Sequence, residues 1–96
     1  MPYVINGTTY RTKADVTKQC QHILYSTAIG NPVMDDDYDF LISVFKNHDG
    51  WDDKIANGLN GITTGVAPEG TICFYLKTDA GLMDISFPHS IRCMKK

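Results

Sequence analysis

The stretch TICFYLKTDAGLMDISF, residues 71–87, decides the fold. Apolar Phe74 and Leu76 alternate with polar or amphipathic side chains, and the alternation resumes after a Thr-Asp-Ala-Gly turn. Successive side chains of a strand point to opposite faces, so this pattern predicts a sheet with one buried face. An earlier apolar stretch leads into it through a Pro-Glu-Gly turn, which makes an antiparallel meander of three strands. The expected strands cover residues 61–67, 71–77 and 82–87.

The chain upstream of this meander predicts a β-hairpin and then a helix. Asn6-Gly7 lies between β-forming residues, and a type I′ turn needs positive φ at both of its central positions. Thr12, with an acid three residues later, fits a capping box. Apolar residues then recur on one helical face up to about Ala28.

A second helix is expected from the run Asp35-Asp36-Asp37 to His48. Its carboxylates should cap the free amides and complement the helix dipole. The Gly-, Asn- and Asp-rich residues 49–61 predict a structured loop, and residues 88–96 a short helical turn. Strands and helices that come in blocks rather than in alternation indicate the α+β class.

Length and composition indicate one globular domain over residues 1–96. With 43% hydrophobic and 21% charged residues, the chain has the composition of a folded domain, and it is too short for two. No apolar run approaches the roughly 20 residues that cross a bilayer, so we expect a cytoplasmic protein that does not associate with membranes. The three cysteines, Cys20, Cys73 and Cys93, form no C-x-x-C pair and are expected to be reduced.

Charge is distributed unevenly along the chain. The formal net charge of −2 argues against strong, sequence-independent binding to nucleic acid. Seven of the eleven acidic residues lie within residues 35–53, whereas most bases lie near the two ends. If the termini meet, as in many small domains, one pole is basic and the other acidic. The expected basic pole contains Arg11, Lys13, Lys18, Lys77, Arg92, Lys95 and Lys96.

Four blocks in the second half resemble a known family. They are FLISVFKNH at 40–48, KIANGLNGITTG at 54–65, KTD at 77–79 and DISF at 84–87. In this order and spacing they are similar to the DCL domain, named for defective chloroplasts and leaves, from about Phe40 to Ile91. The resemblance implies a role connected with nucleic acid. Domains of this family are found in plastid proteins needed for ribosomal RNA maturation, in the tail of a plant RNA polymerase largest subunit, and beside HNH nuclease domains.

Two groups of residues are candidates for contact with RNA or DNA. His48, Trp51 and Lys54 share a loop and could place an aromatic platform beside a cation, as single-strand binding requires. The alternative for this loop is structural, with Trp51 in the core edge and His48 capping the second helix. Tyr75 and Lys77 should share one sheet face with Asp84 and Ser86, which forms a binding surface if that face is open. Arg92 joins these candidates as a base near the C-terminus.

An acidic face is the second kind of candidate site. It could bind a basic protein partner or imitate phosphate, although a solvated surface is the ordinary outcome of such charge. Its members are Asp35, Asp36, Asp37, Asp39, Asp49, Asp52 and Asp53.

Metal binding and catalysis are not expected. Cys20, His22, His89 and Cys93 could supply a tetrahedral zinc site, but their spacing is poor and Cys20 belongs to an apolar helical stripe. No Gly-rich phosphate loop, HExxH or GxSxG pattern is present, and His48 would need Asp84 or Ser86 beside it to act as a base. We therefore expect no cofactor and no enzymatic activity.

These observations lead to two main hypotheses of different classes; a third, an enzyme of unknown reaction, would depend on His48 and Asp84. The first is a non-catalytic adaptor domain that binds RNA or DNA weakly, as a monomer or a homodimer, in RNA processing or beside a nuclease. The second is a small acidic phage or mobile-element protein that inhibits a host nuclease, polymerase or defence complex through its acidic face.

Overall fold

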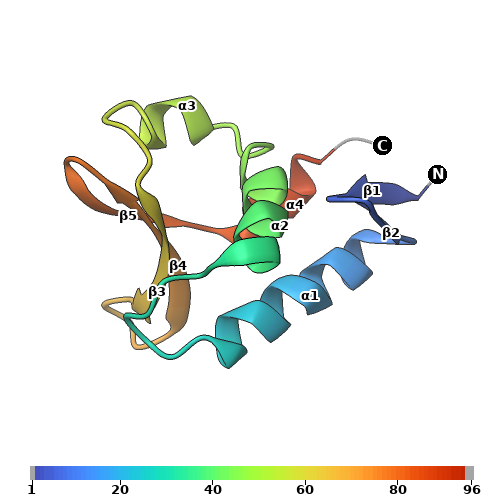
Figure 1. Cartoon of the computed structure of the whole chain (residues 1–96), viewed down its shortest axis with the longest axis horizontal. Coiled ribbons are helices and arrows are strands. Elements are labelled where there is room, and N and C mark those ends of the chain that lie inside the picture. Colours follow the sequence, from blue (N-terminus) through green and yellow to red (C-terminus); the bar gives the residue numbers. More distant parts are fainter. Residues whose placement is uncertain (1, 95–96) are drawn as a thin grey trace.

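The computed structural model describes residues 2–94 and has the expected α+β order (Figure 1). A two-stranded hairpin is followed by helices, a three-stranded antiparallel sheet and a short final helix. The elements are β1 (Tyr3–Ile5), β2 (Thr8–Tyr10), α1 (Lys13–Ser26), α2 (Asp35–Phe45), α3 (Trp51–Lys54), β3 (Gly61–Val66), β4 (Ile72–Thr78), β5 (Gly81–Ile85) and α4 (Phe87–Arg92). No helix in residues 2–94 has the length and apolar character needed to cross a membrane.

The N-terminal hairpin and α1 form for the reasons expected from the sequence. Asn6 and Gly7 have φ values of 50° and 80°, as a type I′ turn requires. The Thr12 side chain caps α1 by accepting a hydrogen bond of 3.2 Å from the amide of Asp15. Cys20 lies on the buried stripe of α1, and burial raises the pKa of its thiol to about 12. It is a core thiol, as predicted for this position.

The start of α2 differs from the prediction. Met34 is the N-cap residue, and no side chain forms a capping hydrogen bond there. The three carboxylates at 35–37 lie in the first turn, where their negative charge complements the helix dipole. None of them accepts a capping hydrogen bond from a backbone amide. The helix also ends at Phe45, three residues earlier than predicted, because the chain then turns and the amide of His48 donates to the carbonyl of Phe45 (2.9 Å).

The predicted loop at 49–61 contains the short helix α3, so that prediction was wrong. Trp51, Ile55 and Leu59 recur at helical spacing and pack against the core, a signal hidden by the surrounding Gly, Asn and Asp residues. The C-terminal helical turn is confirmed but begins at Phe87. The Ser86 hydroxyl caps it by accepting from the amide of His89 at 3.2 Å. Lys95 and Lys96 lie outside the described residues.

The sheet has the order β3-β4-β5 with antiparallel pairing throughout. Phe74 and Leu76 of β4 are fully buried on its inner face, as the alternation predicted. The outer edge of β3 is covered by residues 30–33, since the amide of Val33 donates to the carbonyl of Ile62 (2.8 Å). Among the described residues, no strand pairs with the outer edge of β5.

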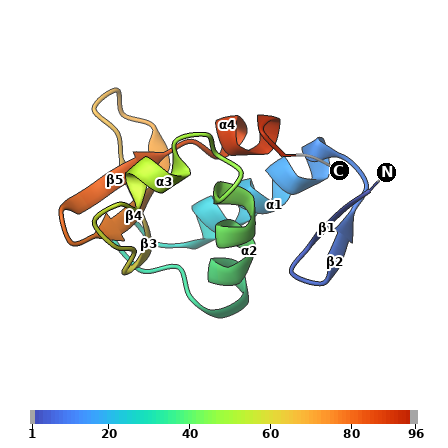
Figure 2. The ribbon, with the colours of Figure 1, turned by 90° about the horizontal axis from the view of Figure 1, so that it is seen from above.

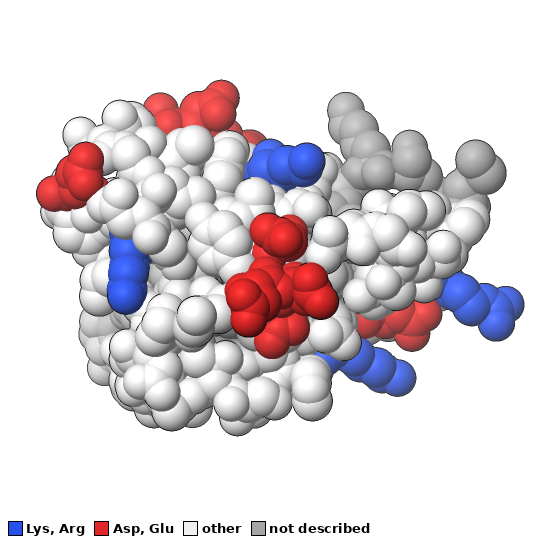
Figure 3. Space-filling view, in the orientation of Figure 1, with Lys and Arg blue, Asp and Glu red and all other residues white. Residues whose placement is uncertain are grey.

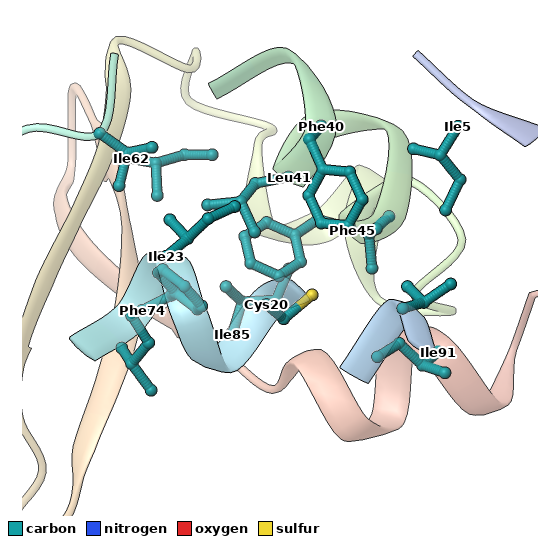
Figure 4. Close-up of a cluster of buried hydrophobic side chains, with 14 of the residues drawn as sticks. Ile5, Cys20, Ile23, Phe40, Leu41, Phe45, Ile62, Phe74, Ile85 and Ile91 are labelled. Carbon is teal, nitrogen blue, oxygen red and sulfur yellow. The ribbon is translucent and has the colours of Figure 1, made fainter. Parts of the chain in front are cut away.

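Helices α1, α2 and α4 and the hairpin gather on one side of the sheet, whereas α3 lies over one end of it (Figures 1 and 2). Their apolar side chains form one core, in which the rings of Phe45 and Phe74 meet edge to face at 5.6 Å between centroids (Figure 4). No described helix lies on the other face of the sheet in either view. The outward-pointing side chains of β4 and β5 are therefore the first place to look for a site.

Candidate functional site

Tyr75 is the aromatic residue on the outer face of β4. Its ring lies over Gly65 of β3, so closely that a Cβ on that glycine would stand 2.8 Å from Tyr75 Cε2. The missing side chain of the glycine thus leaves room for one edge of the ring against the backbone of β3. A hydrogen bond with the Cys73 side chain is the largest cause that raises the pKa of Tyr75, followed by burial.

A groove of about 570 Å³ opens beside this ring. Its floor is the outer face of β4 and β5, and its walls are the β3–β4 turn and the start of α4. Most of its surface is apolar, while two carboxylates and two hydroxyls supply hydrogen-bond acceptors. Its lining residues are Ala67, Pro68, Glu69, Ile72, Cys73, Tyr75, Leu82, Asp84, Ile85, Ser86, Phe87 and Pro88.

Two of the predicted cations lie on the same part of the sheet. Lys77 follows Tyr75 on the outer face of β4, and its Cδ lies 3.7 Å from the position of a Cβ on Gly61. Lys54 reaches over from α3 and donates from Nζ to the carbonyl of Asp84 at 2.8 Å. Asp84 pairs with Tyr75 across the sheet, but the ring of Tyr75 leans over β3, away from β5. Lys77 therefore shares the outer face of β4 with Tyr75, whereas Lys54 lies at β5, close enough to His48 to lower its pKa.

The other predicted contacts to nucleic acid lie elsewhere. Trp51 is half-buried and packs against the core. This is the structural role that the sequence offered as the alternative to nucleic-acid binding. Only 13% of the His48 side chain is exposed. Arg92 lies at the far end of α4, where its carbonyl accepts from Lys13 Nζ at 3.1 Å.

His48, Asp49 and His89 form a cluster between the end of α2 and the start of α4. His89 Nε2 donates to Asp49 Oδ1 at 2.9 Å, and His48 Nδ1 lies 3.4 Å from the same oxygen. The two imidazole rings are 4.4 Å apart between centroids. The amide of Gly50 donates to His48 Nδ1 at 2.8 Å, so that nitrogen carries a lone pair. His48 therefore stabilises the turn into α3 as an acceptor rather than capping α2 as a cation.

The electrostatics of the cluster favour a neutral imidazole beside an ionised carboxylate. Burial is the main cause that lowers the pKa of His48; nearby His89 and Lys54 lower it further, and Asp49 opposes them. The hydrogen bond from His89 is the main cause that lowers the pKa of the Asp49 carboxyl.

This cluster could not be predicted from the sequence because its members are far apart along the chain. Asp49 and His89 are separated by 40 positions, and neither lies in a recognisable motif. The adjacent pair His48-Asp49 is the one signal that could have drawn attention to it. The zinc set considered from the sequence differs, since it contains Cys20, which is fully buried in the core.

The acidic residues do not form a single face. In Figure 3 one group of carboxylates lies over the beginning of α2 and another lies over α3, with uncharged and basic side chains between them. The expected basic pole is divided as well. Lys13 and the end of α4 meet near the chain termini, whereas Lys54 and Lys77 lie at the sheet.

Fold and groove together define a class of small α+β domains in which helices cover one face of a three-stranded sheet. The chain belongs to the family described as protein of unknown function DUF3223, which matches residues 21–91. It is similar to the solution NMR structure of an uncharacterized protein from Rhodospirillum rubrum, with a TM-score of 0.81 and 26% identity, over 98% of this chain and 88% of that one. No curated protein matches the chain. Neither description names an activity, so a functional proposal depends on the site itself.

Proposed function

We propose that this chain is a non-catalytic adaptor domain of the DCL type that binds single-stranded RNA or DNA weakly on the outer face of its sheet. The observation that carries the proposal is the position of Tyr75, whose ring packs against Gly65 and lines an open groove. Lys77 lies two residues further along the same face of β4, and Lys54 lies at β5. Stacking of a base on an aromatic ring does not depend on sequence, and adjacent cations contact the phosphates. We place this adaptor in the cytoplasm, beside enzymes that process RNA or DNA.

The charges around the groove indicate what kind of binding to expect. Among the described residues, no Lys or Arg forms an ion pair with a carboxylate, so Lys77 is available to a phosphate. The net charge of −2 limits the affinity, because few counterions are released. Asp84 and Glu69 line the groove as acceptors and favour bases that present an amino group, as cytosine does through N4.

The test is fluorescence anisotropy with labelled single strands of about 10 nucleotides, at about 50 and 200 mM salt. Tyr75→Ala should weaken binding by about 1–3 kcal/mol, the usual contribution of one stacked base. Lys77→Glu should weaken it and reduce its salt dependence, because a phosphate contact is lost. Cytosine-rich strands should bind more tightly than uracil-rich strands.

Matched controls lie on α1, which packs on the face of the sheet opposite the groove. Tyr25 is 71% exposed and Lys18 is exposed, so Tyr25→Ala and Lys18→Glu change the same residue types without touching the groove. Both controls should bind like the parent protein. If no strand binds at the lower salt concentration, or if the controls lose as much affinity as the groove variants, the adaptor proposal is wrong.

The first turn of α2 supports a second candidate function, inhibition of a basic host protein by a phage or mobile-element protein. Asp36 and Asp37 are exposed, and neither forms a salt bridge with any described Lys or Arg. Unpaired carboxylates in one turn can dock on a basic surface or imitate phosphate. In this case the chain binds no nucleic acid, and Asp36→Lys with Asp37→Lys abolishes binding to a cationic protein target.

A further inference from the structure

We propose that His48, Asp49 and His89 form a three-ligand site for a divalent transition metal ion, with Zn²⁺ the best fit. The proposal goes beyond the nucleic-acid adaptor and does not depend on it. Two imidazole nitrogens and a carboxylate oxygen are a common donor set for Zn²⁺, and three protein ligands leave a coordination position open for water or another ligand.

The distances match those of a metal site. Each residue offers one ligand atom, and the three atoms lie within 4.8 Å of one another. Bonds of 2.0–2.1 Å in a tetrahedral site place neighbouring donor atoms about 3.3 Å apart. The two separations from Asp49 Oδ1, 2.9 Å to His89 Nε2 and 3.4 Å to His48 Nδ1, lie on either side of that value. Small movements of the carboxylate are enough, because 74% of the Asp49 side chain is exposed.

The two histidines are held by elements that are fixed in the core. His48 follows α2, whose buried residues include Phe45, and His89 lies in α4 beside the buried Ile91. Their rings are already side by side, so the ligands are largely arranged before an ion binds. His89 is 37% exposed, which leaves an approach for the ion from solvent.

Binding would replace two contacts that the cluster now makes. The ion would take the place of the proton that His89 Nε2 donates to Asp49, and that proton is released or moves to the other ring nitrogen. At His48 the ion competes with the Gly50 amide for the Nδ1 lone pair. Lys54 is the lysine whose positive charge lowers the pKa of His48. Its ammonium group donates a hydrogen bond to the carbonyl of Asp84.

The experiment is titration of the purified protein with Zn²⁺ alone by isothermal calorimetry, together with visible absorption of Co²⁺ as a spectroscopic substitute. We expect one ion per chain. His89→Ala and Asp49→Asn should each weaken binding by about 100-fold or more, since even loss of a supporting contact to a ligand weakens affinity about 10–100-fold. His22→Ala is the matched control, because His22 is exposed on α1, and it should bind like the parent.

Two further variants test whether the thiols bind the ion and whether a loss of folding mimics a loss of the site. A Cys73→Ser, Cys93→Ser double variant should retain full affinity, because the half-buried thiols are outside the proposed ligand set. His89→Gln removes the donor nitrogen while it keeps a side chain of similar polarity, and circular dichroism verifies that the fold survives. The proposal is overturned if Zn²⁺ does not bind, if His89→Ala and His89→Gln bind like the parent, or if the cysteine variant loses the site.

Discussion

Phe74→Ala should lower the free energy of unfolding by about 3–5 kcal/mol, the largest effect expected of a single substitution in this chain. Phe74 is fully buried, and its ring contacts Phe45 at 5.6 Å and Phe87 at 6.0 Å between centroids, both edge to face. Removing the ring loses its transfer free energy and leaves a cavity between the sheet and α2 that these elements cannot close. Urea unfolding followed by circular dichroism measures the loss.

A surface substitution on the neighbouring strand provides the control for Phe74→Ala. Leu82 of β5 is 59% exposed, so Leu82→Ala should change the free energy of unfolding by no more than about 0.5 kcal/mol. A loss below about 1 kcal/mol for Phe74→Ala would mean that the core does not pack around this ring as described.

Gly65→Ala should destabilise the protein by about 1–3 kcal/mol, as is usual when an atom is forced into a packed contact. The added Cβ would lie 2.8 Å and 3.0 Å from two ring carbons of Tyr75, so the ring must move away from β3. The same change should also weaken binding of single strands, because the stacking ring is displaced. Chemical denaturation and the anisotropy titration measure the two effects on one variant.

The Tyr75→Ala background separates this clash from a general effect on β3. Without the ring, Gly65→Ala should be neutral or stabilise the strand by up to about 1 kcal/mol, since alanine loses less backbone entropy on folding than glycine. The coupling between the two positions should therefore be about 1–4 kcal/mol in a double-mutant cycle. Equal costs of Gly65→Ala in both backgrounds would show that Tyr75 does not lie over Gly65.

Local patterns were sufficient to predict most of the fold. Asn6-Gly7 predicted the hairpin turn because few other dipeptides accept two positive φ values. The alternation around Phe74 predicted which face of the sheet is buried. Both features depend on neighbours in the sequence, and the structure confirms both. The helix α3 was missed because its packing on the core overrides the low helical preference of its neighbouring residues.

The candidate sites were only partly predictable, because they depend on contacts between distant segments. The shared face of Tyr75 and Lys77 follows from strand periodicity and could be predicted. The approach of Lys54 to Asp84 joins positions 30 apart, and the cluster of His48, Asp49 and His89 joins α2 to α4. No local sequence pattern predicts these contacts, because they form only when the helices pack against the sheet.

The central claim is that single-stranded nucleic acid binds on the outer face of the sheet. The most direct test is a titration of the ¹⁵N-labelled protein with a cytosine-rich single strand at about 50 mM salt, followed by amide chemical shifts. The account predicts that the largest changes fall on β4 and β5 around Tyr75, Lys77 and Asp84, and that they fade at about 200 mM salt. No change at the lower salt concentration, or changes confined to the first turn of α2, would contradict it.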